Sequence, residues 1–147
     1  MLANRSMPHC AVIPVLVYDD VGEAVGWLCE TFGFTERWRA GDHRAQLAVG
    51  DGAAVALTRR PGENTPNAGG DSVMVRVEDV NSHHERALQR GARILEPPAD
   101  HPYGERQYTA EDNAGHRWTF SQSIADVAPE DWGGTPAASR DSSRKVT

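Results

Sequence analysis

The chain has 147 residues, enough for one ordinary domain or for two very small modules that share a core, and its apolar share of 39% is typical of globular proteins. Lys and Arg number 15 against 21 Asp and Glu, and a chain of net charge -6 without a basic run is a poor binder of nucleic acid or of anionic membranes. No apolar run has the length of a membrane span, and the start, MLANRSMPHC, lacks the apolar core of a secretory signal, so we expect a cytoplasmic protein.

The first half of the chain predicts a strand, a helix and three more strands. Residues 11–18, AVIPVLVY, are rich in β-branched side chains, which favours a strand. Asp20 and Glu23 have the spacing of a capping box, and Gly33 ends the apolar pattern that follows, so we expect a helix between Asp20 and Gly33. The remaining strands are expected at residues 34–39, 44–49 and 53–58.

The same order of elements returns after a Pro- and Gly-rich linker at residues 60–71. A strand at 72–77 precedes a helix that runs from Asp79 to Gly91. A short strand at 92–96, a turn-rich loop at 97–104, and strands at 106–111 and 117–122 complete the unit.

These two halves predict an internal duplication. The segment VYDDV at 17–21 matches the segment RVEDV at 76–80. A glycine ends each predicted helix at a similar distance from its capping aspartate, Gly33 after Asp20 and Gly91 after Asp79. We therefore expect one α+β domain over residues 11–122, built from modules 11–59 and 72–122. A flexible start at 1–10 precedes it. The tail at 123–147 contains a helical turn near 128–132 that docks through Trp132, and it is expected to be disordered after 134.

The ordered set of motifs resembles the vicinal oxygen chelate superfamily, which includes glyoxalase I, extradiol dioxygenases, fosfomycin-resistance enzymes and bleomycin-binding proteins. The resemblance rests on IPVLVYDDVGEAVGWLCETFGF, GDGAAVAL, RVEDVNSHHERALQRGA and YGERQYTAEDNAGHRWTFSQ. It implies two βαβββ modules whose curved mixed sheets form a cup. Such a cup is often completed by a second subunit, so a homodimer is expected.

The resemblance also implies where metal ligands would lie. Metal-dependent members place His or Glu at four symmetric positions, which in this sequence are Ile13, Ala56, Ser72 and Thr119. None of these side chains is a plausible donor to a divalent ion, so no metal and no other cofactor is expected. The neighbouring His83 and His84 diverge on their helix and are expected at a solvated surface, and Cys10 and Cys29 are expected to be free thiols.

Strand alternation extends the cup-facing set from those four positions. The same-face neighbours are Val15, Val17, Ala54, Thr58, Met74, Arg76, Arg117 and Ser121. A lining that is small or apolar at its centre and polar toward its ends suits a cavity for an organic ligand. It equally suits two sheets that close into a packed core, and both alternatives stay open.

The segment YGERQY supplies further candidates, because a similar motif in bleomycin-binding relatives borders the ligand groove. Tyr103 and Arg106 are expected ligand contacts, and Glu105, Arg106 and Tyr108 are the candidate catalytic residues. Arg106 could hold a carboxylate or a ring, or it could instead pair with Glu105 or Glu111. Trp38 on the second strand is the best candidate for stacking, whereas Trp118 should face a helix. The expected ligand-binding set is Trp38, Ala56, Ser72, Met74, Arg76, Tyr103, Arg106, Tyr108 and Thr119.

The resemblance and the missing metal donors together favour a metal-independent small-molecule binder. Such a protein would sequester an aromatic or cationic organic compound, as in the drug-resistance branch of the family. The alternative is an enzyme of the same superfamily, a lyase, isomerase or dioxygenase with an atypical site. A third alternative is a module that binds a protein partner.

Overall fold

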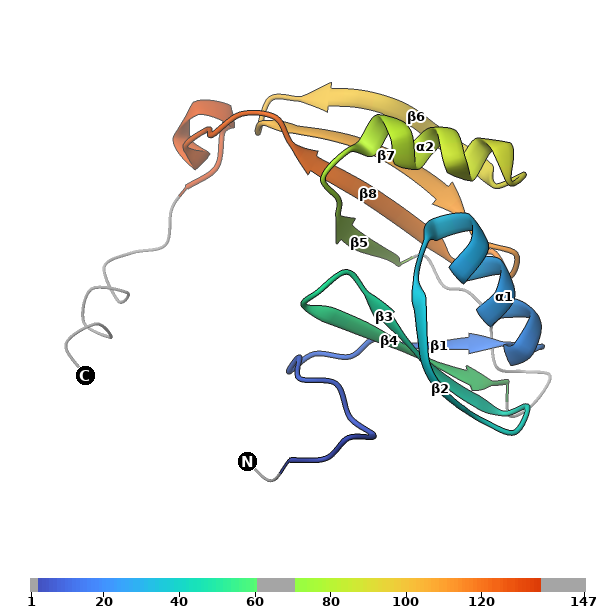
Figure 1. Ribbon diagram of the computed structural model, residues 1–147. Helices are drawn as coiled ribbons and strands as arrows, with labels where there is room; N and C mark the ends of the chain where they lie inside the picture. Colours follow the sequence, from blue (N-terminus) through green and yellow to red (C-terminus); the bar gives the residue numbers. More distant parts are fainter. Residues whose placement is uncertain (1–2, 61–70, 136–147) are drawn as a thin grey trace.

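The computed structural model describes residues 3–60 and 71–135, which form two modules of like construction (Figure 1). The first module contains β1 (Val15–Tyr18), α1 (Val21–Phe32), β2 (Thr35–Ala40), β3 (Arg44–Val49) and β4 (Ala53–Arg59). The second contains β5 (Ser72–Arg76), α2 (Val80–Gln89), β6 (Arg93–His101), β7 (Glu105–Glu111) and β8 (Arg117–Ser123), followed by the 3-10 turn η1 (Pro129–Trp132).

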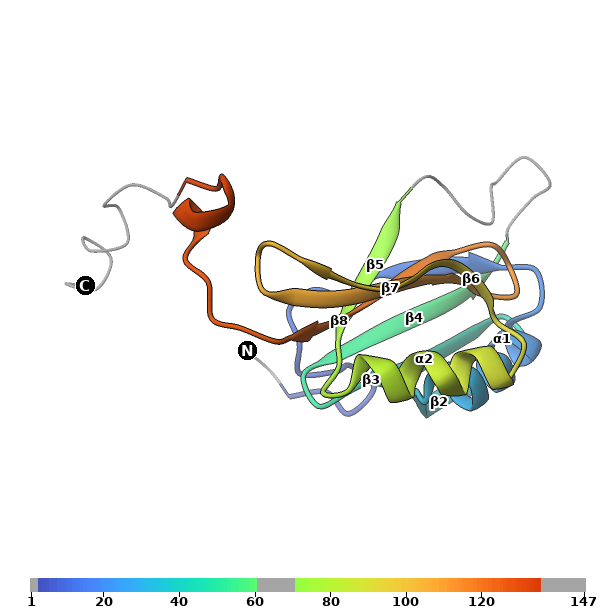
Figure 2. The ribbon, with the colours of Figure 1, turned by 90° about the horizontal axis from the view of Figure 1, so that it is seen from above.

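Each module folds its strands into one four-stranded sheet. The order is β1-β4-β3-β2 in the first sheet and β5-β8-β7-β6 in the second. The first strand of each module pairs in parallel with the last, and the other neighbours are antiparallel. Figure 2 shows α1 and α2 on the same side of the two sheets. The predicted α+β fold, two βαβββ modules that form a cup, is confirmed.

The helix signals in the sequence have the expected geometry. The Asp20 side chain accepts a hydrogen bond of 2.9 Å from the backbone N–H of Glu23, and Gly33 ends α1 in the left-handed conformation with φ of 80°. In the second module the Asp79 side chain accepts from the backbone N–H of Ser82 at 3.1 Å. Capping by an acidic side chain thus begins both helices.

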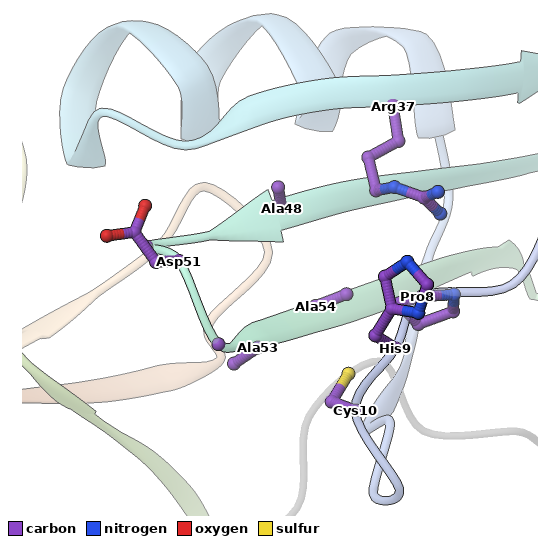
Figure 3. A pocket seen from close by; sticks show the side chains of 10 residues that line it. Pro8, His9, Cys10, Arg37, Ala48, Asp51, Ala53 and Ala54 are labelled. Carbon is purple, nitrogen blue, oxygen red and sulfur yellow. The ribbon is translucent and has the colours of Figure 1, made fainter.

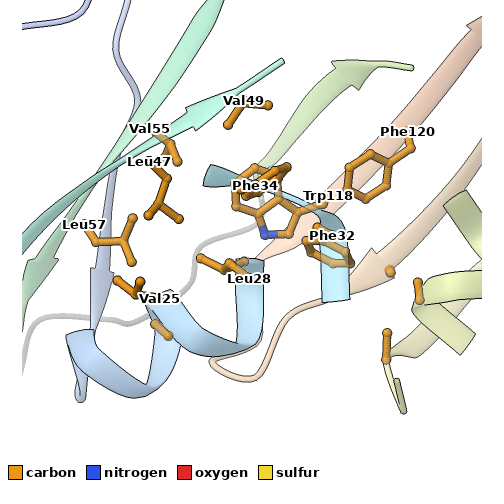
Figure 4. Close-up of a cluster of buried hydrophobic side chains, with 14 of the residues drawn as sticks. Val25, Leu28, Phe32, Phe34, Leu47, Val49, Val55, Leu57, Trp118 and Phe120 are labelled. Carbon is orange, nitrogen blue, oxygen red and sulfur yellow. The ribbon is translucent and has the colours of Figure 1, made fainter. Parts of the chain in front are cut away.

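Aromatic side chains join the two modules into one core (Figure 4). Phe32 at the end of α1 meets Phe120 of β8 with ring centroids 4.9 Å apart, and Phe34 meets Trp118 at 5.2 Å. Trp118 is completely buried there, which confirms that it faces the helices rather than the cup. Because neither helix could bury its apolar face alone, this shared cluster stabilises both modules together.

A buried carboxylate links the modules beside this core. Asp112 accepts hydrogen bonds from the hydroxyl of Tyr18 at 2.7 Å and from the indole N–H of Trp118 at 3.1 Å. The backbone N–H groups of Ala114 and His116 donate to its other oxygen, each at 2.9 Å. Four donors compensate for the burial of the charge. Burial and the adjacent carboxylate raise the pKa of Tyr18 far above its usual range, so Tyr18 remains a donor.

Two strand boundaries differ from the prediction. β1 begins at Val15 rather than at residue 11, since Pro14 has no N–H for a ladder, although its carbonyl still accepts from the N–H of Ala56 at 2.9 Å. β6 continues to His101 through Pro97 and Pro98, where a loop was expected. This strand lies at the edge of its sheet and shifts register twice, which lets prolines remain in it.

The chain ends depart from the core on the side away from α1 (Figure 1). Residues 3–10, predicted to be flexible, lie against the first sheet, while η1 follows the second sheet, close to the predicted turn at 128–132. Residues 61–70 of the expected linker, and the tail from 136 onward that was expected to be disordered, lie outside the described residues. No helix in the described ranges is long and apolar enough to cross a membrane.

Candidate functional site

The second sheet presents a row of polar side chains on the face opposite its helix. Met74 and Thr119 are directly paired across β5 and β8, as are Arg76 and Ser121 one step further along. Gln107 on β7 pairs with the same Ser121. Since paired residues point to the same face of a sheet, these side chains share the concave face, as the alternation predicts.

A cavity of about 510 Å³ lies over this face, and we call it the second-sheet cavity. Strands β5, β7 and β8 form its floor, and the segment after β8 forms one wall. Its lining residues are Met74, Arg76, Tyr103, Glu105, Gln107, Ser121, Val127, Pro129 and Trp132. This size falls within the range of pockets that hold small organic ligands, about 300–1,000 Å³.

The polar side chains of the floor form a series of hydrogen bonds that runs from Tyr103 to Glu105. The Tyr103 hydroxyl donates to Oε1 of Gln107 at 3.0 Å, and the Gln107 amide N–H donates to Oγ of Ser121 at 3.0 Å. The Ser121 hydroxyl then donates to a carboxylate oxygen of Glu105 at 2.6 Å. Because these hydrogen bonds link the floor side chains to one another, the side chains are held in place before any ligand arrives.

Glu105 is an ionised group at the end of this series. Hydrogen bonds from Ser121 and Ser123, with the positive charge of Arg76 nearby, lower the pKa of its carboxyl. The Arg76 guanidinium itself donates to Oγ of Ser123 at 2.9 Å. The cavity therefore offers one carboxylate and one guanidinium on its polar floor and an apolar, aromatic wall beside them.

The wall is fixed to the sheet by the turn before β7. The backbone N–H groups of Ile124 and Ala125 donate to the carbonyl of Gly104 at 2.8 and 3.3 Å. The ring of Trp132 meets the ring of Tyr103 edge-on at 5.5 Å, which confirms the predicted docking of this tryptophan. Tyr103 stacks in turn on His101 at 5.1 Å with only 9° between the ring planes. Two aromatic rings, Tyr103 and Trp132, thus border the cavity, and His101 packs against the first of them.

The first sheet presents its concave face to the start of the chain. Beneath residues 8–10 lies a smaller cavity of about 310 Å³, the first-sheet cavity, with Ala48 and Ala54 on its floor (Figure 3). Arg37 reaches over the sheet from β2, where a bulge shifts the register between Glu36 and Trp38. Predicted ligand contacts Trp38 and Ala56 therefore belong to this face, across the cup from the second-sheet cavity.

Two predicted site residues lie on the opposite side of the second sheet. Arg106 and Tyr108 alternate with Glu105 and Gln107, so they face α2. Arg106 forms an ion pair with Asp100 at 2.6 Å, rather than with either of the two glutamates considered in the sequence.

Tyr108 is buried beside His83, which corrects the expectation that His83 is solvated. The His83 Nε2 lies 3.0 Å from the carbonyl of Phe32 and must donate to it. Its Nδ1 then accepts from the Tyr108 hydroxyl at 2.5 Å. Burial lowers the pKa of His83 and raises that of Tyr108, so this pair is neutral and connects α2 to the end of α1.

Comparison with known proteins agrees with this geometry. The sequence profile of the Glyoxalase/Bleomycin resistance protein/Dioxygenase superfamily matches residues 6–120. The chain belongs to this superfamily.

Individual relatives extend the assignment. The crystal structure of TioX from Micromonospora sp. ML1 superposes with a TM-score of 0.66 at 35% identity, over 77% of this chain and 98% of TioX. An uncharacterized protein of Mycobacterium bovis is 25% identical over 80% of this chain and 86% of its own length. A superfamily protein from Nocardioides superposes with a TM-score of 0.58 at 23% identity, over 89% of each chain, and shows the fold alone.

The residues at the metal positions that the resemblance implies do not fit a metal ion. The structure makes these positions equivalent in the two modules, since Val15 pairs with Ala56 as Met74 pairs with Thr119. Ala56 and Ile13 offer only alkyl groups, and Ser72 and Thr119 offer neutral hydroxyls. Across residues 3–60 and 71–135, no three His, Cys, Asp or Glu side chains form a group that could hold a metal.

The structure brings together some of the predicted site residues and adds others. Met74, Arg76, Tyr103 and Glu105 line the second-sheet cavity, while Ser72 lies further along β5 in a separate small cavity beside β1. Thr119 shares the concave face and bonds to Thr109 at 2.9 Å. Gln107 was missed, although its alternation with Tyr108 could have identified it. Val127 and Pro129 were missed because no sequence pattern indicates where a tail folds back.

Proposed function

We propose that this protein binds a small organic molecule in the second-sheet cavity without the help of a metal. The observation that carries the proposal is the cavity itself, which combines a prearranged polar floor with an aromatic wall. Pockets of this size and lining are typical of ligand sites. Membership of a superfamily that includes bleomycin resistance proteins supports the same function.

The lining favours a flat aromatic ligand that carries a positive charge. The rings of Tyr103 and Trp132 offer stacking surfaces at one side of the cavity. The carboxylate of Glu105 attracts a cation from the floor, and Glu130 and Asp131 place two further exposed acids in η1. The residues that line the cavity include one cation, Arg76, and one acid, Glu105, and the two acids of η1 add negative charge beside Pro129 and Trp132. An anionic ligand would therefore approach more negative than positive groups.

Proflavine, a fluorescent planar cation, tests the proposal by titration in buffer with EDTA. We expect saturable binding at one site per chain, and a loss of about tenfold in affinity for Glu105→Gln, since a charge-assisted contact contributes about 1.5–3 kcal/mol. Glu85→Gln, on the exposed face of α2, is the matched control and should bind like the unmodified chain. Absence of saturable binding to proflavine and to a panel of other aromatic cations would contradict the proposal.

We further propose that two copies of the chain associate along the gap between the sheets. Val12, Val15 and Met74 are exposed by 79%, 59% and 61%, and Val12 and Met74 border one cavity of about 570 Å³ between the modules. Apolar side chains clustered in this way are typical of an interface. We expect a dimer mass by light scattering and a monomer for Val12→Asp. The equally apolar Leu88, on α2, supplies the control Leu88→Asp, and a monomeric unmodified chain would contradict the proposal.

A further inference from the structure

The start of the chain lies across the concave face of the first sheet without becoming a strand of it. Residues 3–10 form a turn of their own, in which the N–H of Met7 donates to the carbonyl of Asn4 at 3.0 Å. The N–H of Ser6 also donates to the Asn4 side chain at 3.0 Å. No strand pairing joins this segment to β2, β3 or β4 in the part of the chain that the structure describes.

Two side chains of β2 hold the segment, and both donate to its backbone. The indole N–H of Trp38 donates to the carbonyl of Ser6 at 3.0 Å, and the guanidinium of Arg37 donates to the carbonyl of Arg5 at 3.2 Å. The β2 bulge places these consecutive side chains on one face, which alternation would otherwise forbid. Arg37 also donates to the side chain of Gln46, which is only 3% exposed beneath it.

These contacts recognise a backbone rather than particular side chains. Adjacent carbonyls of the turn over residues 4–7 accept from both donors, while the side chains of Arg5 and Ser6 remain exposed. The floor below is shallow, with Ala48 and Ala54, and leaves the first-sheet cavity unfilled under Pro8 and the two residues after it. Any amide-containing chain that forms the same turn satisfies the same donors, because β2 forms no hydrogen bond to the side chains of residues 5 and 6.

We propose that residues 4–10 are a displaceable strap, and that the first-sheet face beneath it binds an amide-containing ligand that forms a similar turn, a peptide or peptide-like compound. The carbonyls of such a ligand replace those of Arg5 and Ser6 on Arg37 and Trp38. This site is separate from the second-sheet cavity, and it uses neither Glu105 nor the aromatic wall. The strap holds the face closed until a ligand competes for the two donors.

Cysteine alkylation in the full chain, read by mass spectrometry at each cysteine, reports the state of the strap. Cys10 lies half-buried at the strap's end and lines the first-sheet cavity, whereas Cys29 lies on α1 and serves as the internal control. The probe is a blocked peptide with the sequence ANRSMPH, residues 3–9 of this chain, added in excess. We expect it to accelerate alkylation of Cys10 by about fivefold or more, with Cys29 unchanged.

The donor variant Trp38→Phe combined with Arg37→Leu separates the two parts of the proposal. In this variant Cys10 should be alkylated rapidly without peptide, and added peptide should not increase the alkylation rate further. An unchanged Cys10 rate in this variant would overturn the strap. A fast variant together with no effect of the peptide on the unmodified chain would overturn the ligand class. A rise at Cys29 equal to that at Cys10 would mean general unfolding and would also overturn the proposal.

Discussion

The two concave faces of the molecule share one scaffold and differ in chemistry. Val17 lies opposite Thr58 on the first sheet, and at the equivalent place on the second sheet Arg76 lies opposite Ser121. The duplicated modules hold these pairs in the same register, so the chemical difference between the two faces comes from a few side chains that point into the cup. A duplicated fold can therefore keep its core while one face becomes apolar and shallow and the other becomes polar.

The chain ends sharpen this contrast, because each end lies over one face. The strap places its own carbonyls on the donors of Arg37 and Trp38, and so it covers the first face. The tail instead bonds through its backbone to Gly104 and adds the ring of Trp132 beside the second face. One end closes a site and the other enlarges one.

Loss of the Asp112 carboxylate should have the largest effect on stability, because its hydrogen bonds to Tyr18 and Trp118 link the two modules. Asp112→Ala leaves four donors without an acceptor, including the buried hydroxyl of Tyr18 and indole of Trp118. We expect the free energy of unfolding to fall by about 3 kcal/mol or more, as measured by urea denaturation. Asn113→Ala, at the exposed neighbouring position, should change it little. Equal stability of the two variants would show that the link between the modules does not depend on this carboxylate.

A methyl group at Gly104 should affect the second face and spare the first. The Cβ of Gly104→Ala would lie 2.5 Å from the carbonyl oxygen of Ala125, at a φ of +84° that alanine rarely adopts. We expect a loss of about 1–3 kcal/mol in stability together with weaker proflavine binding. Gly26→Ala is the control, since nothing lies within 4 Å of the added methyl on the exposed side of α1. If Gly104→Ala binds proflavine as tightly as the unmodified chain, the tail does not form the wall.

Removal of the Trp132 ring distinguishes the two faces directly. Trp132→Ala should weaken proflavine binding by about tenfold, because a stacking surface is lost, while the free energy of unfolding stays within about 0.5 kcal/mol. Trp38→Phe alters the tryptophan of the other face and should leave proflavine affinity unchanged. The opposite ranking of the two variants in a fluorescence titration would assign the ligand to the first face.

The smallest expected effect is a dependence of the free energy of unfolding on pH that arises from His83. This side chain connects α2 to the end of α1, on the side of the sheets opposite the cup. Burial lowers the pKa of His83 in the folded state, with Arg86 nearby and Tyr108 and the Phe32 carbonyl bonded to its ring. The unfolded state therefore binds the proton more readily, and stability present above pH 6.5 is lost as the pH falls below it. His83→Gln should lose less stability than the unmodified chain between pH 7.5 and pH 5 in urea titrations. His84→Gln should keep the original slope, and a His83→Gln slope that matched it would rule out this role.

Much of the fold could be predicted from the sequence, because local signals define it twice. Asp20, Gly33 and Asp79 mark the helix boundaries by capping, and alternation assigns Trp118 to the core and Ser121 to the cup. The same alternation places Tyr108 on the face opposite Glu105. The segment YGERQY therefore could not supply a single site from all of its residues, because neighbouring side chains of a strand point to opposite faces.

The remaining features depend on contacts that no local pattern contains. His83 is partly buried because α2 meets the end of α1, 51 residues earlier in the chain. The strap and the tail are polar or irregular segments whose positions depend on the bulge at Arg37 and on the turn at Gly104. Long-range packing of this kind follows only from the assembled structure.

The indole N–H signals of the four tryptophans give the most direct test of the central claim, that the second-sheet cavity is the ligand site. In a ¹H–¹⁵N correlation spectrum titrated with proflavine, we expect the signal of Trp132 to shift to saturation. The signal of Trp38, beneath the strap, should stay in place. Saturable proflavine binding that leaves Trp132 unmoved, or that shifts Trp38 instead, would contradict the account.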